Sequence, residues 1–284
     1  MSWARSVGLA VERRVAEGVR RARGVPAIAR DRVTLRTGQG LQIEACVHRG
    51  AAAGREGAAV LLCPGIDDAG AVFDSWQAPV SADEVAALGA VVLHFDPAGR
   101  GSSWGSEDYG GNEHQEDVAI AFAHLAGLEG VDPRRIGIVA ISHGAAMAIG
   151  AAARRSLGAR WVIDWEGPSD REIMTGGGVH MAPADGHALT DDAYWAPREP
   201  VRHVGALGCA YVRLQADPDH AQAGETRHAT RMVQAAASGN LPWFQINDHP
   251  RNDLPPRPNW LAPGMLAANR ALLRKIRTLI DTER

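Results

Sequence analysis

A chain of 284 residues is long enough to bury one large α/β core or two small ones, and 45% hydrophobic with 22% charged residues is ordinary for a globular enzyme. The net charge of −3 argues against nucleic acid as a partner, and no apolar run approaches the ~20 residues of an integral membrane segment. Without an apolar signal segment, and with three cysteines far apart in sequence, the chain is predicted to be cytoplasmic with free thiols.

The first 24 residues predict an amphipathic helix with a basic face. Apolar side chains recur every four positions from Trp3 to Val19, and six arginines face two glutamates. Helices of this kind usually dock on their own domain or on a second subunit, so a homo-oligomer through this helix is one expectation. Binding to an anionic membrane surface is the weaker alternative. We therefore expect an N-terminal helix and linker at 1–30, followed by one domain at 31–284.

The rest of the chain alternates between strand and helix patterns. A β-rich pair of runs around a glycine turn predicts a hairpin at 32–49. Ser81 and Glu84 form a capping box that begins a helix. Continuous apolar runs predict buried parallel strands, and the remaining segments are strands at 58–65, 89–101, 134–142, 159–167, 206–217 and 241–248 and helices at 113–128, 144–157 and 263–280. This alternation predicts a parallel, doubly wound sheet.

Ser142 stands where the buried strand at 134–142 meets the alanine-rich helix at 144–157. A nucleophile needs this setting, because a sharp strand-to-helix turn lifts the hydroxyl above the carboxyl edge of the sheet. Such a turn requires small residues two positions away on either side, and Ala140 and Gly144 meet that requirement. The alternative, a serine that only caps a helix, is less consistent with this context.

Four motifs in the right order resemble the α/β-hydrolase superfamily over most of residues 33–280. They are the elbow at Ser142, the turn "LLCPG" at 61–65, the loop with Asp96, Gly99, Gly101 and Ser103, and the segment leading through Asp-Pro-Arg-Arg into the elbow. The last of these is similar to the dienelactone-hydrolase and acylaminoacyl-peptidase-like branch. The resemblance implies an α/β fold with a mostly parallel eight-stranded sheet, helices on both faces and a short lid at about 168–205.

The resemblance also implies a base and an acid for Ser142, in the chain order serine, acid, histidine. His249 follows the last strand, where the family keeps its histidine, whereas His220 and His228 are predicted to lie on a helix that points away. Asp217, followed by proline as in the family, is the predicted acid. Asp219 is the near alternative and Asp164 the distant one.

An oxyanion hole needs two backbone N–H groups aimed at the developing charge. The residue after the nucleophile, His143, supplies one amide, and the turn after the third strand supplies the other from Ile66 or, alternatively, Asp67. Side chains near this edge are candidates for a substrate pocket: Asp67, Trp165, Glu166, Met181 and Trp195. Carboxylates among them would favour a cationic substrate, although loop acids are usually only solvated.

The sequence gives no motif for a metal or a cofactor, so none is predicted. Asp217, Asp219 and His220 lie close in sequence, yet no ligand set of the usual spacing surrounds them. The expected function is a serine hydrolase that cleaves carboxylic esters of small molecules through an acyl-enzyme. A peptidase or amidase with the same triad is one alternative. A catalytically silent scaffold that acts as a binding protein is the other.

Overall fold

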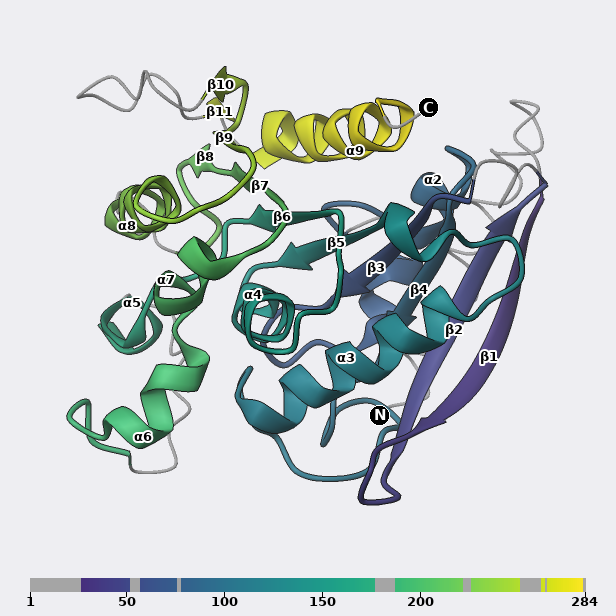
Figure 1. Cartoon of the computed structure of the whole chain (residues 1–284), viewed down its shortest axis with the longest axis horizontal. Coiled ribbons are helices and arrows are strands. Elements are labelled where there is room, and N and C mark those ends of the chain that lie inside the picture. Colours follow the sequence, from purple (N-terminus) through teal and green to yellow (C-terminus); the bar gives the residue numbers. More distant parts are fainter. Residues whose placement is uncertain are drawn as a thin grey trace.

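The computed structural model describes residues 27–51, 57–75, 78–176, 187–221, 226–250, 262–263 and 265–282. Within these residues one twisted sheet runs through the molecule (Figure 1). Its strands, in spatial order, are β1 (Ile28–Arg36), β2 (Gln42–Gly50), β4 (Val91–Phe95), β3 (Ala59–Cys63), β5 (Ile136–Ile141), β6 (Trp161–Trp165), β7 (Ala210–Leu214), β9 (Phe244–Ile246) and β10 (His249–Pro250). A separate parallel pair joins β8 (Ala216–Asp217) to β11 (Ala262–Pro263).

The strands from β4 to β9 are parallel, while β1 with β2, β2 with β4, and β9 with β10 pair antiparallel. The predicted mostly parallel sheet is therefore confirmed. Eight strands form its body, and the two-residue β10 adds a ninth at the edge. The hairpin predicted at 32–49 is also confirmed, because Leu35 pairs with Ile43 across β1 and β2.

Helices cover both faces of the sheet, as predicted (Figure 1). On one face α3, α4 and α8 contribute Val118, Met147 and Met232 to a buried cluster, and on the other α2 and α9 contribute Val85 and Leu272. The helices are η1 (Gly70–Asp74), α2 (Ala82–Ala86), α3 (Asn112–Ala126), η2 (Pro133–Arg135), α4 (Gly144–Arg154), α5 (Arg171–Gly176), α6 (Asp192–Trp195), η3 (Ala196–Arg198), α7 (Pro200–His203), η4 (Val204–Ala206), α8 (Arg227–Ala237) and α9 (Met265–Asp281).

Local signals read from the sequence are present in the structure. Ser81 caps α2, its hydroxyl accepting a hydrogen bond from the Glu84 amide while the Glu84 carboxylate accepts one from the Ser81 amide. None of the three cysteines forms a disulfide; Cys63 and Cys209 are buried and Cys46 is half-buried. The predicted N-terminal helix lies outside the described residues, so the division at residue 30 stays a prediction. In the part of the chain that is described, no helix is both long enough and apolar enough to cross a membrane.

The topology positions the candidate site. Parallel strands β3, β5, β6 and β7 end at one edge of the sheet, and the loops after them carry the residues singled out in the sequence. Five short helical turns, from α5 to η4, lie between β6 and β7, in the range where the sequence predicts a lid.

Candidate active site

Ser142 occupies a strained turn between β5 and α4. Its φ of 53° lies in the left-handed region, which costs a non-glycine residue of order 1–3 kcal/mol and recurs at functional sites. A Cβ on Gly144 would lie 2.5 Å from the carbonyl oxygen of Pro64, so the need for a small residue there is confirmed. The backbone of Ser142 is fixed at the sheet edge, because its amide donates a hydrogen bond to the carbonyl oxygen of Trp165 (2.8 Å).

The first turn of α4 is crowded by backbone from two other loops. A Cβ on Gly167 would lie 2.3 Å from the Cβ of Ala145, and one on Gly110 would lie 2.6 Å from the Cβ of Ala146. Both distances are far below van der Waals contact. The elbow is therefore fixed by backbone packed directly on the helix.

A chain of two hydrogen bonds leads from Ser142 through His220 to Glu166. Ser142 Oγ lies 2.8 Å from His220 Nε2, and His220 Nδ1 lies 2.7 Å from Glu166 Oε2. A carboxylate only accepts, so Nδ1 of a neutral His220 carries the proton and Nε2 accepts from the serine hydroxyl. This is the tautomer that a base needs in order to take the serine proton.

Glu166 is fixed at the end of β6. It too adopts a positive φ, of 53°, and its side chain is fully buried. Its carboxylate accepts hydrogen bonds from the Ala216 amide (2.7 Å) and the His220 amide (3.0 Å) in addition to the His220 ring. Three N–H donors stabilise the negative charge of this buried carboxylate and hold it in one position. The Trp165 ring packs 4.8 Å from the imidazole of His220.

The expectation that His220 lies on a helix pointing away is wrong. Helix α8 begins only at Arg227, and His220 belongs to the turn that follows β8. Strand β8 ends at Asp217, and the chain bends at Pro218 and again at His220. His220 is then anchored there because its own amide donates to Glu166.

Among the described side chains, the structure joins His220 and Glu166 to Ser142, where the sequence predicted His249 and Asp217. His249 lies in β10, paired with Ile246 of β9, and its side chain is outside what the structure describes. Asp217 is exposed in β8. The carboxylate that is hydrogen-bonded to the imidazole of His220, which in turn contacts Ser142, is the buried Glu166. Glu166 was expected only to line a pocket.

The two alternative acids have other partners. Asp219 lies behind the imidazole, with Oδ1 3.5 Å from His220 Nδ1, and it accepts hydrogen bonds from Gln215 (2.6 Å) and interacts with His228 (3.1 Å). Asp164 is buried in a structural ion pair with Arg213 (2.7 Å).

The sequence predicts that the amides of His143 and Ile66 line an oxyanion hole, and the structure describes the surroundings of both. Arg100 donates to the carbonyl oxygen of Gly65 (2.5 Å). Because the C=O and N–H of a trans peptide point in opposite directions, the amide of Ile66 is turned away from Arg100. Gly65 itself is close to Ser142, since a Cβ there would lie 3.5 Å from the Cβ of Ser142. Neither Ile66 nor His143 donates its amide to another described residue. Burial lowers the pKa of the His143 ring to about 3, so that ring is neutral.

Arg100 is itself held by a paired carboxylate. Its guanidinium binds Glu107 through two hydrogen bonds, of 2.5 and 2.7 Å, and is 5% exposed. The loop that carries Arg100 is closed by Asp96, whose carboxylate accepts from the amides of Gly70 and Ser102. The motif recognised in the sequence therefore supports the turn with Gly65 and Ile66.

The same loop is tied to α3 by Asp117, whose carboxylate accepts from the Ala98 amide (2.8 Å). Burial raises the pKa of Asp117 to about 7. The folded protein keeps this proton up to about pH 7, while the unfolded chain loses it near pH 4, so stability falls as the pH rises through this window. Asp117→Asn removes the buried charge, so its stability should not depend on this proton. The Tm of the variant minus the Tm of the native chain should therefore increase by roughly 3–8 °C between pH 5 and pH 8.

Thermal unfolding at both pH values measures this difference. The matched control is Glu129→Gln, an exposed carboxylate in the turn after the same helix, for which the difference in Tm from the native chain should be the same at both pH values. If the Tm difference between Asp117→Asn and the native chain stayed constant or decreased as the pH rises, the assigned charge state would be contradicted.

The remaining pocket candidates differ in their surroundings. Asp67 is exposed on the turn after β3, and Trp165 is 2% exposed against His220. Trp195 is 1% exposed and packs with Met174 against Ala146, so it joins the segment between β6 and β7 to the first turn of α4. Met181 lies outside the described residues.

The carboxylates and imidazole at the edge could in principle hold a metal, since ligand atoms of Glu166, Asp219 and His220 lie within 4.8 Å of one another. Their ring and carboxylate atoms are, however, engaged by Ser142 and by N–H donors. The arrangement thus fits proton transfer from a hydroxyl better than metal coordination.

Comparison with solved structures identifies the architecture. An esterase of Pyrococcus furiosus superposes with a TM-score of 0.65 at 12% identity, over 90% of this chain and 93% of that one. The chain has the α/β-hydrolase fold. Dipeptidyl peptidase 4 of Porphyromonas gingivalis (TM-score 0.62, 17% identity) and a puromycin-hydrolyzing peptidase of Mycobacterium tuberculosis (0.62, 18%) match 89% and 87% of this chain, which spans only 35% and 37% of those longer proteins. No family model and no curated protein sequence matches.

The α/β-hydrolase fold predicted from the sequence is therefore confirmed. The strand order β1-β2-β4-β3-β5-β6-β7-β9, with β2 antiparallel to its neighbours, brings Ser142 and Glu166 to the ends of adjacent strands.

Proposed function

We propose that this protein is a serine hydrolase that cleaves carboxylic esters through an acyl-enzyme intermediate. One observation carries the proposal: the continuous hydrogen-bond chain from Ser142 Oγ through His220 to the buried carboxylate of Glu166. A serine hydroxyl becomes a useful nucleophile only when a base takes its proton, and an acid keeps that base in the right tautomer.

In the first half of the reaction, Ser142 Oγ attacks the ester carbonyl and its proton passes to His220 Nε2. The carbonyl oxygen becomes an oxyanion, which the amides of His143 and Ile66 would stabilise, each by about 3 kcal/mol. The C–O bond to the alcohol then breaks, and the alcohol leaves with the proton from His220. Water repeats the cycle on the acyl-serine and releases the carboxylic acid.

Esters are favoured over peptides as substrates by the chain's similarity to a whole esterase. The P. furiosus esterase matches along 93% of its length, whereas this chain spans 35% and 37% of the two peptidases. An amidase with the same triad is the second candidate, because those peptidases share the fold. A silent scaffold is disfavoured, since nucleophile, base and acid are all in hydrogen-bonding position.

The segment from 168 to 205 is proposed to act as a lid. Trp195 and Met174 anchor it on Ala146, two residues into the helix that follows Ser142. We further propose that the protein works in the cytoplasm, where thiols stay reduced, because none of its three cysteines forms a disulfide. A homo-oligomer through the N-terminal helix remains an additional proposal.

Covalent labelling tests the proposed function. A fluorophosphonate probe should label the folded protein at one site, identified by peptide mass spectrometry as Ser142, and Ser142→Ala should abolish the label. The matched control is Ser169→Ala, a buried serine outside the triad, which should be labelled as the native chain is. Absence of labelling on folded protein would favour a scaffold. A panel of p-nitrophenyl esters and aminoacyl anilides then separates esterase from amidase activity.

A further inference from the structure

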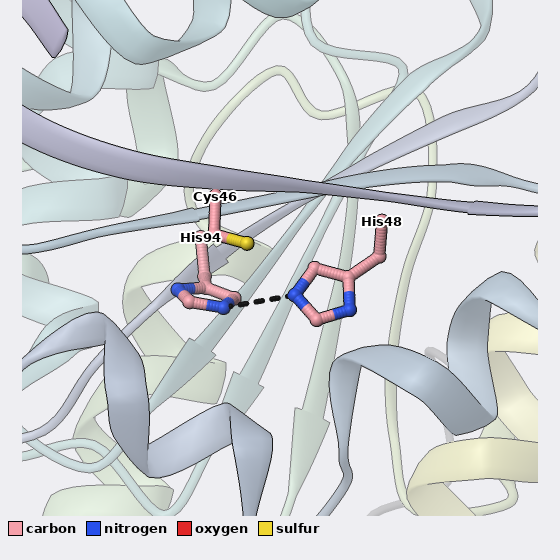
Figure 2. A group of neighbouring side chains, drawn as sticks. All are labelled: Cys46, His48 and His94. Carbon is pink, nitrogen blue, oxygen red and sulfur yellow. Dashed lines mark hydrogen bonds between the residues drawn. The ribbon is translucent and has the colours of Figure 1, made fainter. Parts of the chain in front are cut away.

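A second cluster of reactive side chains lies inside the fold, between the sheet and α2. Cys46 and His48 stand two residues apart on β2, so their side chains leave the same face of the strand. His94 of β4 is the direct cross-strand partner of Cys46. Figure 2 shows the thiol and both imidazoles directed toward a common point. Asp74, the last residue of η1, adds a carboxylate from a third element.

The donor atoms of this cluster are close together. His48 Nε2 lies 3.1 Å from His94 Nε2, and Asp74 Oδ1 lies 3.6 Å from the first and 3.7 Å from the second. Ligand atoms of Cys46, His48 and His94 all fall within 4.8 Å of one another. Both imidazoles are buried, with His48 fully inaccessible and His94 4% exposed.

These spacings match the edges of a metal coordination tetrahedron. With bonds of about 2.0–2.1 Å to nitrogen or oxygen and 2.3 Å to sulfur, neighbouring ligand atoms around tetrahedral zinc are separated by roughly 3.3–3.6 Å. The three measured separations lie between 3.1 and 3.7 Å. A thiolate, two imidazoles and a carboxylate are also the ligand types that zinc selects. We propose that Cys46, His48 and His94 bind one Zn²⁺ in a structural site, with the carboxylate of Asp74 beside the two imidazoles.

The surroundings of His48 support this assignment. Its Nδ1 lies 2.9 Å from Asp83 Oδ1. Since the carboxylate can only accept, the ring proton is on Nδ1 and the lone pair of Nε2 points into the cluster. A carboxylate behind a histidine is the arrangement that orients metal-bound imidazoles. Asp83 is in turn bound by Arg30, whose Nε lies 3.2 Å from Oδ1, so its charge is already balanced.

Charge balance is also favourable. A thiolate at Cys46 and a carboxylate at Asp74 cancel the two positive charges of Zn²⁺, and the two imidazoles bind as neutral ligands. The bound metal would therefore leave no net charge in this buried region, which is what a low-dielectric environment requires. Cys46 is only half-buried and gives the ion a route from solvent. Binding releases the thiol proton of Cys46 to water.

The site would join three elements that are remote in sequence. It connects β2 to β4 and fixes the end of η1, the segment that follows the turn bearing Gly65 and Ile66. Its function would be to stabilise the fold, since a metal that binds only the folded chain raises the free energy of unfolding. This role is independent of the hydrolase activity.

The experiment begins with full-length protein stripped of metal by chelation and dialysis. After incubation with ZnCl₂ and removal of free ion, elemental analysis should find one zinc per chain, and the Tm should rise by roughly 5 °C or more. Loading with Co²⁺ instead should give intense visible bands of a tetrahedral ion together with a thiolate-to-cobalt charge-transfer band. If the native chain holds less than about one zinc per chain after incubation with ZnCl₂ and removal of free ion, the proposal is overturned.

Matched variants locate the ion. Cys46→Ala should abolish the charge-transfer band and lower the affinity for zinc at least ~10-fold, whereas Cys209→Ala removes a buried cysteine elsewhere and should change neither. His94→Gln should lose the bound zinc. Circular dichroism of each metal-free variant verifies that it has folded. Retention of zinc and the cobalt spectrum in Cys46→Ala, with loss in His220→Ala, would place the metal at the catalytic edge and refute the assignment.

Discussion

Replacing His220 by alanine is expected to lower kcat for an ester substrate about 10⁵–10⁶-fold, because the Ser142 proton then has no acceptor. Ser142→Ala should give a loss of the same size. The double variant should be no slower than either single one, since residues that act as a unit are not additive. Initial rates of p-nitrophenyl ester hydrolysis measure all three, with folding verified by circular dichroism.

His249→Ala is the decisive control for this first result. The sequence alone favours His249 as the base, whereas the structure bonds His220 to Ser142. We expect His249→Ala to retain kcat within about tenfold of the native value. If His249→Ala were inactive and His220→Ala active, the base would belong to the last strand and the observed hydrogen bond would not be the catalytic one.

The second large effect is expected for Glu166→Gln, with a loss in kcat of about 10⁴-fold. The glutamine amide can donate to His220 Nδ1, which favours the tautomer that carries its proton on Nε2 and so cannot accept from serine. The size and shape of the side chain are preserved, so the loss would report on tautomer and charge. It is measured with the same ester under saturating substrate.

Two carboxylates of the same edge serve as controls for Glu166. Asp217→Asn should change kcat little, because that side chain is exposed in β8. Asp219→Asn should cost no more than about tenfold, since its oxygen lies 3.5 Å from His220 Nδ1 and contributes only charge. A larger loss for Asp217→Asn than for Glu166→Gln would restore the acid predicted from the sequence.

The place of Ser142 in a strand-to-helix turn could be predicted from the sequence because its signal is local. Ser142 lies between a continuous apolar run and an alanine-rich helix, and Gly144 is required by a contact within the same turn. The strands and helices were predicted for the same reason, since capping residues and apolar runs act over a few neighbours. These features depend little on how distant segments meet.

The acid and base depend on distances between strand ends, which the sequence does not contain. Glu166, Asp217 and Asp219 all follow strands that end at the same edge, so each was an eligible carboxylate. The position of His220 depends on where α8 begins, and helix boundaries are less certain than helices themselves. The only local clue was the position of Glu166 directly after a buried strand that ends at Trp165.

The proposed zinc site escaped the sequence analysis for a related reason. Cys46 and His48 show the two-residue spacing of one strand face, but His94 joins them only through the register between β2 and β4. No linear motif relates these positions to Asp74, since the intervening distances in sequence reflect the topology of the sheet.

The crowded first turn of α4 limits how this protein could acquire a new specificity. Any side chain at Gly110 or Gly167 would collide with Ala145 or Ala146, and Gly144 faces the Pro64 carbonyl. Substitutions at these positions would displace the nucleophile itself before they reshaped a binding surface. Under directed evolution, beneficial changes should therefore accumulate in the segment between β6 and β7, and a mutant library is best concentrated there.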